Sequence, residues 1–239
     1  MSKIIAVITA RGGSKRIPRK NIKEFCGKPI LCYSIEAALA AGIFDEVMVS
    51  TDDEEIAEIA RKAGANVPFM RSEAAASDFA TTNDVLKEVF SEYEKMGQHF
   101  DLAVCIYPTA PFVTADKLKN AVKRMEEEHA DGVTPVVKYS FPPQRAFIVK
   151  GGSLQYEYPE YAAVRSQDLE PVYHDCGQFY VMKVKNVLQD IPAKKLLPLV
   201  MSELEVQDID NEEDWKIAEI KYKICLLYTS DAADDRISV

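Results

Sequence analysis

The chain has 239 residues, of which 47% are hydrophobic, and it carries a formal net charge of -9. This length supports one large globular domain with a substantial core rather than two full domains. No apolar run reaches the roughly 20 residues that a membrane-spanning helix needs, and the acidic balance argues against a nucleic-acid-binding protein.

Strands and helices alternate along the chain in the order expected for an α/β fold, a mostly parallel sheet with helices on both faces. Apolar and amphipathic patterns predict strands at 4–10, 46–50, 67–70, 102–107, 132–138 and 178–183. The same patterns predict helices at 30–41, 54–62, 83–95, 115–128 and 211–223. Thr51 or Asp52 is expected to cap the second of these helices.

Residues 139–173 interrupt this alternation. They are rich in proline and hold six Tyr and Phe residues between 139 and 161, so they predict a small subdomain inserted between strands of the main sheet. Residues 225–239 resemble the translation of a sequencing adapter followed by an out-of-frame remainder. We therefore expect one domain over 1–224 and a non-native tail over 225–239 that is frayed or loosely held.

The five cysteines include no C-x-x-C pair, and they predict buried thiols rather than disulfides or metal ligands. The predicted first strand begins within three residues of the N-terminus, and no apolar signal segment precedes it. A cytoplasmic protein is expected from both features.

The segment Arg11-Gly-Gly-Ser-Lys-Arg-Ile-Pro-Arg-Lys-Asn21 directly follows the first predicted strand. From Arg11 to Lys23 there are six cations and no acid, in a chain that is acidic as a whole. A glycine-containing basic loop at the carboxyl end of a buried strand offers backbone N–H groups and fixed charge to phosphates. Its spacing matches neither the P-loop nor the G-x-G-x-x-G fingerprint, and a solvated basic patch is the alternative.

Four further motifs recur in order along the chain. Ser50-Thr-Asp-Asp53 follows the second predicted strand, and Arg71-Ser-Glu followed by Ala76-Ser-Asp78 comes after the third. Tyr107-Pro-Thr-Ala-Pro111 follows the fourth, and Gln207-Asp-Ile-Asp210 lies near the end. Together these motifs resemble the nucleotidyltransferases that activate nonulosonic acids, the family of CMP-sialic acid synthetases, over about residues 3–224.

The resemblance implies a Rossmann-like nucleotidyltransferase fold whose inserted subdomain serves dimerisation and sugar binding, hence a homodimer. It implies an enzyme that joins CTP to a sugar acid and releases pyrophosphate. Segments 141–147 and 165–180 look most like family members that use pseudaminic acid. CMP-N-acetylneuraminate or CMP-legionaminate synthesis by the same machinery is the alternative, as is a non-catalytic nucleotide-binding regulatory protein.

Family-matched positions supply the expected nucleotide site. The catalytic cations are Arg11, Lys15 and Lys20, and the remaining nucleotide contacts are Ala10, Gly12, Gly13, Asn21, Arg71, Ser77 and Asp78. Arg16 and Arg19 have no firm assignment. For Arg71 a capping or surface role is the alternative.

Asp208 and Asp210 are the candidate metal ligands. In an extended segment, residues two apart point the same way, so two carboxylates can share one Mg²⁺ that bridges phosphate oxygens. The resemblance assigns Mg²⁺ to the same pair. Capping of the closing helix is the alternative for this acidic cluster.

The expected sugar-acid contacts are Tyr107, Thr109, Gln144, Arg145, Arg165, Gln167 and His174. Arginines suit the carboxylate of an α-keto sugar acid because their geometry is bidentate. Surface or intersubunit hydrogen bonding is the alternative for Gln144 and Gln167, and His174 serves either as a general base or as a structural partner of Asp175. Tyr107 stands where relatives that use sialic acid carry Gln, which favours a less hydroxylated sugar.

Overall fold

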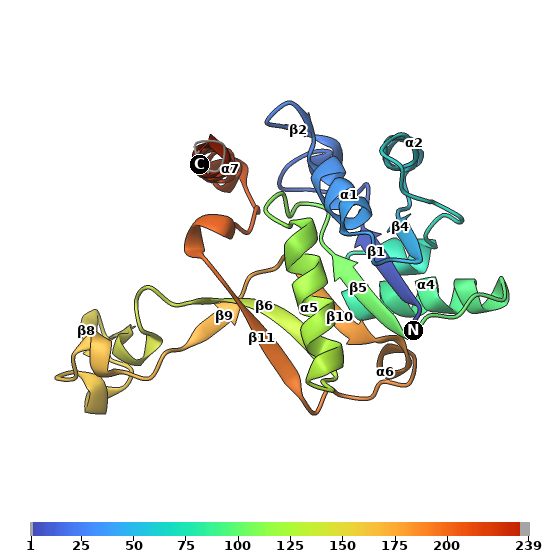
Figure 1. Ribbon diagram of the computed structural model, residues 1–239. Helices are drawn as coiled ribbons and strands as arrows, with labels where there is room; N and C mark the ends of the chain where they lie inside the picture. The colour runs from blue at the N-terminus through green and yellow to red at the C-terminus, as the bar shows by residue number, and fades with distance from the viewer. Residues whose placement is uncertain (1, 235–239) are drawn as a thin grey trace.

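The computed structural model describes residues 2–234, with side chains described to residue 227. One sheet forms its centre, with the strand order β11 (Leu196–Met201), β6 (Gly132–Lys138), β10 (Phe179–Lys183), β5 (Leu102–Ile106), β1 (Ile4–Thr9) and β4 (Glu46–Ser50). The short strand β9 (Tyr173–Asp175) pairs with the far end of β6. Figure 1 shows this sheet running through the body of the molecule.

Most strands of the sheet run in one direction. β1 is parallel to both β4 and β5, and β11 is parallel to β6, whereas β10 is antiparallel to its two neighbours β5 and β6. The carboxyl ends of β1, β4 and β5 therefore meet at one edge, where ligands bind in open α/β sheets. The predicted α/β fold class is confirmed.

Helices cover both faces of the sheet. Helices α1 (Ile30–Ala41), α2 (Glu54–Lys62) and α5 (Ala115–Glu127) pack on one face, against Ala6 and Ile8 of β1. Helices α4 (Thr82–Lys95) and α6 (Val184–Leu188) pack on the other face, against Ile5 and Val7. The alternation of these fully buried residues along β1 is the period of two that a strand imposes on its side chains.

A separate apolar cluster joins the end of the basic loop to the closing helix. Trp215 of α7 (Glu212–Asp234) packs edge-on against Phe25 at a ring-centroid distance of 5.6 Å, and Ile17 and Ile209 belong to the same cluster. Phe25 lies in the small hairpin of β2 (Glu24–Phe25) and β3 (Lys28–Pro29). This packing brings residues 208–210 beside the basic loop, although nearly 190 residues separate them, as the Lys20–Ile209 contact shows.

The inserted segment forms an arm at the end of β6 and β9. Its hairpin of β7 (Phe147–Lys150) and β8 (Ser153–Tyr156) projects away from the body of the molecule (Figure 1). Phe141 is 89% exposed and Val149 is 72% exposed, so the arm presents apolar side chains to solvent. Exposed apolar groups gathered in this way mark a surface suited to association.

Several features differ from the sequence predictions, three of them in the main body of the chain. The strand predicted at 67–70 is wrong: in this described segment, Asn66 makes only an isolated bridge with Met48, and Pro68 has no N–H to donate to a ladder. The edge strand β11 was missed, and it contains Pro198, which the edge of a sheet tolerates because one side of the strand has no neighbour. The cap of α2 is Asp53, whose carboxylate accepts from Ile56 N at 3.0 Å, rather than Thr51 or Asp52.

Short elements complete the chain. They are the four-residue helix α3 (Glu73–Ala76) and 3-10 turns at Lys20–Ile22, Pro143–Arg145, Pro159–Tyr161, Ser166–Asp168 and Glu203–Glu205. Helix α7 continues past the predicted end at 223, so the chain is helical across the suspected boundary at residue 225. Within the described residues, no helix is both long and apolar enough to cross a membrane.

The two ends of α7 should contribute unequally to stability. Trp215 is 3% exposed, so Trp215→Ala should cost about 3 kcal/mol or more of unfolding free energy through the cavity it leaves. Leu226 and Leu227 are 51% and 65% exposed, so truncation after Ile224 should leave the melting temperature nearly unchanged. Thermal denaturation of both variants is the measurement. A large loss of stability on truncation would show that the tail is integrated into the fold.

Candidate active site

A cavity of about 470 Å³ opens at the carboxyl ends of β1 and β5. Its wall is built from the basic loop, the segment between α3 and α4, and the turn after β5. The sequence-predicted residues that line it are Arg11, Lys15, Lys20, Asn21, Arg71, Ser77, Asp78, Tyr107 and Thr109, and the unassigned Arg16 joins them. Residues far apart in the sequence are therefore gathered around one space, four of them loop cations.

Acidic partners hold the cations of the cavity. Asp78 receives hydrogen bonds from Arg11, at 3.0 Å, and from Lys15. These bonds, that from Lys15 first, lower the pKa of Asp78. Because the side chains of Arg11 and Asp78 are 41% and 46% exposed, this pairing is weak and an anionic ligand can replace it at little cost.

Asn21 and Arg71 line the cavity and hydrogen-bond to the segments that form its wall. The amide of Asn21 donates to the carbonyl oxygen of Arg11 at 2.8 Å, which fixes the start of the basic loop. The guanidinium of Arg71 donates to Ser50 Oγ at 2.9 Å and to the Ser50 carbonyl at 2.6 Å. Arg71 is only 7% exposed, and burial lowers its pKa. The surface and helix-capping alternatives for Arg71 are therefore wrong.

Ala10 and Gly13 complete the predicted nucleotide contacts. Ala10 is fully buried, and its N–H donates to the Ser50 carbonyl at 3.0 Å, which ties the end of β1 to β4. Gly13 has open space around its Cα, with no heavy atom within 4 Å of a built Cβ. Gly12 differs, because a Cβ there would lie 2.8 Å from Asp53 Oδ2.

Asp208 and Asp210 lie opposite the basic loop. Asp210 forms an ion pair with Arg16 at 2.6 Å, and Lys20 Nζ donates to the Ile209 carbonyl between the two acids, also at 2.6 Å. Burial lowers the pKa of Lys20, and the charges of Asp210 and Asp208 oppose that shift. The lysine ammonium thus lies near both carboxylates.

Helix capping does not occupy this acid pair. Asn211 Oδ1 accepts from the N–H groups of Glu213 and Asp214, at 2.8 and 3.0 Å, and Asp214 accepts from those of Asp210 and Asn211. The side chains of Asp208 and Asp210 take no part in these bonds, so the capping alternative is wrong for both carboxylates.

The acid pair suits a divalent cation that a phosphate completes. Partial burial and then the neighbouring Asp210 raise the pKa of Asp208, which indicates two carboxylates close enough to repel each other. Within the described part of the chain, no group of three or more His, Cys, Asp and Glu side chains gathers as a metal site. Two carboxylates with the remaining ligands from water and phosphate are typical of Mg²⁺.

A second, more apolar cavity of about 310 Å³ adjoins the first. Thr82 and Tyr107 line both cavities, and Leu86, Val181, Met182 and Leu196 are among the apolar residues around the second. The ring of Tyr107 packs edge-on against Tyr180 at 5.5 Å. Tyr180, which donates to Asp175 Oδ1 at 2.8 Å, was not among the predicted site residues, although it ends the segment 165–180 that resembles family members using pseudaminic acid.

The predicted residues of the inserted segment do not line the first cavity. Gln144 donates to the Glu170 carbonyl at 2.9 Å, Arg145 to Ser166 Oγ at 3.1 Å, and Arg165 to Asp168 at 2.7 Å, all within the arm. His174 stacks beside Tyr139 at 4.7 Å and, with Gln167, also belongs to the arm or its base. In a single copy of the chain, these side chains are thus separate from the basic loop.

Comparison with known proteins places these features in a family. Residues 5–216 match the family described as cytidylyltransferase. The chain is 40% identical over 225 residues to the pseudaminic acid cytidylyltransferase of Campylobacter jejuni, covering 93% of this chain and 97% of that protein. It is 31% identical over 228 residues to the CMP-N,N'-diacetyllegionaminic acid synthase of Legionella pneumophila, covering 91% and 95%.

Solved structures share the fold. A CMP:2-keto-3-deoxy-manno-octonic acid synthetase complexed with CTP superposes with a TM-score of 0.68 at 18% identity, covering 94% of this chain and 99% of that one. A 4-diphosphocytidyl-2C-methyl-D-erythritol synthase from Anaerococcus prevotii superposes with a TM-score of 0.63 at 14% identity, covering 93% and 99%. At these identities the likeness concerns the fold alone.

The two glycines of the basic loop should respond differently to substitution. Gly12→Ala brings a methyl group against the Asp53 carboxylate and should displace the loop, whereas Gly13→Ala meets nothing within 4 Å. We expect Gly12→Ala to weaken CTP binding by about tenfold or more and Gly13→Ala to change it less than about threefold. Calorimetric titration measures both. Equal affinities in the two variants would contradict the close packing described for Gly12.

Proposed function

The chain belongs to the cytidylyltransferase family, and from this membership we propose that it joins CTP to pseudaminic acid to give CMP-pseudaminic acid and pyrophosphate. The observation that carries the proposal is the meeting of the basic loop and the Asp208/Asp210 pair beside one cavity. The identity of 40% to a pseudaminic acid cytidylyltransferase supports this sugar over the other nonulosonic acids.

The reaction forms one bond to phosphorus and breaks another. The anomeric hydroxyl oxygen of the sugar attacks the α-phosphorus of CTP, its proton leaves to a base or to water, and the oxygen bridging to the β-phosphorus departs with pyrophosphate. Catalysis of this step depends mainly on positioning and on charge stabilisation. Arg11, Lys15 and Lys20 serve this purpose by holding the phosphate oxygens as charge moves onto the leaving group.

Asp208 and Asp210 are proposed to hold Mg²⁺ when CTP is bound. A cation bound there would neutralise phosphate charge, and the two carboxylates would supply oxygen ligands of the kind that Mg²⁺ prefers. Arg16 now pairs with Asp210, and an Asp210 that held a cation would release the Arg16 guanidinium to an anion. Asp78 similarly releases Arg11 and Lys15 to the triphosphate.

The sugar is proposed to bind where the two cavities meet, at Tyr107. An aromatic wall of Tyr107 and Tyr180 beside an apolar cavity suits a deoxygenated sugar with acyl groups. A sugar with more hydroxyl groups needs more hydrogen-bonding partners than this wall offers. Asn21, Arg71 and Ser77, which line the first cavity, are proposed as further contacts of the nucleotide.

We propose a homodimer in which the arm of one copy covers the sugar site of the other. The exposed apolar side chains of the arm, Phe141, Phe147, Val149 and Leu154, support association with a second copy. Gln144, Arg145, Arg165, Gln167 and His174 would then reach a sugar carboxylate that they do not approach within one copy. The cytoplasm is the proposed location, which the free thiols of Cys26, Cys32, Cys105 and Cys176 support.

The activity is tested by pyrophosphate release from CTP with purified chain, Mg²⁺ and a panel of sugar acids. Pseudaminic acid should give the highest kcat/KM, followed by N,N'-diacetyllegionaminic acid and N-acetylneuraminic acid. Preference for either of the latter would replace the proposed sugar. Nucleotide binding without turnover of any of them would instead indicate a regulatory protein.

The metal pair is tested by isosteric substitution. Asp208→Asn and Asp210→Asn keep size but remove the charge that holds Mg²⁺, so each should lower kcat by about 100-fold or more while the melting temperature changes little. Excess Mg²⁺ should relieve part of the loss. Wild-type turnover in either variant, or full wild-type activity in EDTA, would refute the assignment.

Tyr107 is tested as the specificity residue. Tyr107→Gln replaces an aromatic wall with an amide that can both donate and accept, so the preference for pseudaminic acid over N-acetylneuraminic acid should narrow by about tenfold. The ratio of kcat/KM values for the two sugars is the measurement. An unchanged ratio would mean that Tyr107 does not contact the sugar.

A further inference from the structure

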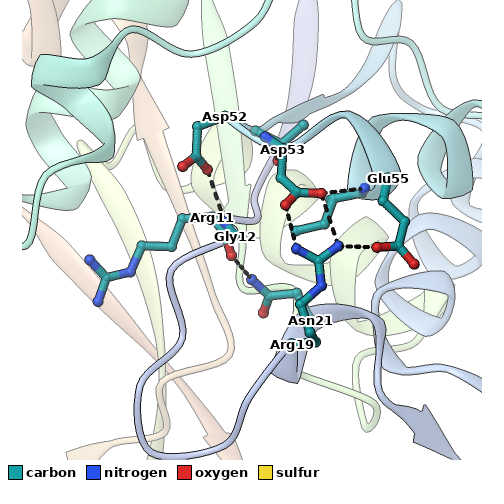
Figure 2. Close-up of polar contacts among 9 residues, drawn as sticks. Arg11, Gly12, Arg19, Asn21, Asp52, Asp53 and Glu55 are labelled. Atoms are coloured by element: carbon teal, nitrogen blue, oxygen red, sulfur yellow. Dashed lines mark hydrogen bonds and ion pairs between the residues drawn. The ribbon is translucent and has the colours of Figure 1, made fainter.

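Arg19 differs from the other cations of the basic loop. It is absent from the lining of the 470 Å³ cavity, unlike Arg11, Lys15 and Lys20. Its guanidinium instead makes a bidentate contact with Asp53, including Nη2 to Oδ1 at 3.0 Å, and a further ion pair with Glu55. Figure 2 shows this guanidinium between the two acids, while the side chain of Arg11 extends in another direction.

The backbone at Arg19 is also unusual. Its φ of 56° lies in the left-handed region, which a residue with a Cβ seldom adopts. The Arg19 carbonyl accepts from the N–H groups of both Ile22 and Lys23 at 3.0 Å, so this conformation begins the turn that carries Lys20 and Asn21. The contacts of the Arg19 side chain with Asp53 and Glu55 offset part of the cost of this conformation.

The corner between β4 and α2, residues 51–53, also holds the beginning of the basic loop. Asp52 Oδ1 accepts from the Gly12 N–H at 2.9 Å, and Asp53 lies so close to Gly12 that a Cβ would not fit (Figure 2). Asp53 is fixed in turn, because it caps α2 through Ile56 N. The hydrogen bond from Arg19 lowers the pKa of Asp53, so the carboxylate is charged at neutral pH.

We propose that Arg19 and Asp53 form a clamp that positions the basic loop for the triphosphate, and that Arg19 itself does not touch the nucleotide. Asp52 holds the loop at Gly12, and Asp53 holds it at Arg19, just before Lys20. The segment between these two points carries Lys15 and Arg16 into the cavity. Arg19 is a positioning residue for the proposed reaction, and the inference rests on that proposed function. Arg19, which the sequence left without a firm assignment, thus has carboxylate partners in place of a phosphate ligand.

The clamp acts by limiting the conformations of the loop before CTP arrives. A loop that is already ordered loses less conformational entropy when its cations engage the phosphates, so affinity is higher. Cutting the clamp should therefore raise Kd and KM for CTP more than it lowers kcat at saturating CTP. A residue needed only for folding would not produce that separation.

A double-substitution cycle tests the clamp. Arg19→Ala removes the guanidinium, and Asp53→Asn removes the charge while keeping an oxygen that can cap α2. Each single variant should raise the Kd for CTP, measured by calorimetry in Mg²⁺, by about tenfold, and the double variant should bind no more weakly than either single one. Arg61→Ala is the matched control, because it breaks the exposed Arg61–Glu54 pair on the same helix α2, outside the cavity.

The double-substitution cycle distinguishes a positioning role of Arg19 from direct contact between Arg19 and the phosphates. If Arg19 contacted the phosphates, Asp53→Asn would free the guanidinium and leave Kd unchanged or lower, a result that would overturn the proposal. A Kd equal to wild type in Arg19→Ala would overturn it too, as would an equally large effect of Arg61→Ala.

A second measurement does not need the nucleotide. Hydrogen exchange at the amides of residues 12–20 should be faster in both single variants than in wild type and unchanged in Arg61→Ala. Unchanged exchange in Arg19→Ala and Asp53→Asn would overturn the clamp. A wild-type chain that fails to bind CTP would overturn the proposed function instead, and the exchange result distinguishes the two failures.

Discussion

The site depends on the pairing of one basic loop with acids that come from three distant segments. Asp78 holds Arg11 and Lys15, the corner after β4 holds Arg19, and Asp210 holds Arg16. Without these acids, six cations in thirteen residues would repel one another and spread the loop. The pairs differ in strength, because Asp78 is half-exposed and Asp53 is only 21% exposed in its side chain. Weak pairs suit exchange with phosphates, and the stronger one suits permanent anchoring.

The sheet explains why these segments meet. The basic loop follows β1, the acidic corner follows β4, and the Tyr107 turn follows β5, which are three adjacent parallel strands. Their carboxyl ends share one edge, so the order of strands brings the proposed nucleotide and sugar contacts together. The segment 208–210 reaches the same edge by a different route, through packing of Trp215 against Phe25. The apolar cluster around α7 thus positions Asp208 and Asp210, the proposed metal ligands.

Much of this arrangement was predictable from the sequence. Periodicity located five of the seven strands of the main sheet and the helices of nine residues or more, since buried strands and amphipathic helices have distinct patterns. The motif order indicated which strand ends carry the site. Pairing partners were not predictable: the six cations look alike in the sequence, and only the fold separates Arg19 from the cavity-facing ones. The β11 strand was not predicted, and whether a strand that holds a proline such as Pro198 lies at an edge becomes clear only from the strand order of the sheet. The capping of α7 by Asn211, rather than by Asp208 or Asp210, likewise depends on local geometry.

The central claim is that a triphosphate exchanges with acids on the cavity-facing cations while the Arg19 anchor stays in place. A crystal structure of the chain with CTP and Mg²⁺ tests it most directly. The account predicts phosphate oxygens on Arg11, Lys15 and Lys20, the cation on Asp208 and Asp210, and an intact Arg19–Asp53 contact. A triphosphate bound away from the basic loop, or one coordinated by Arg19 with Asp53 released, would contradict it.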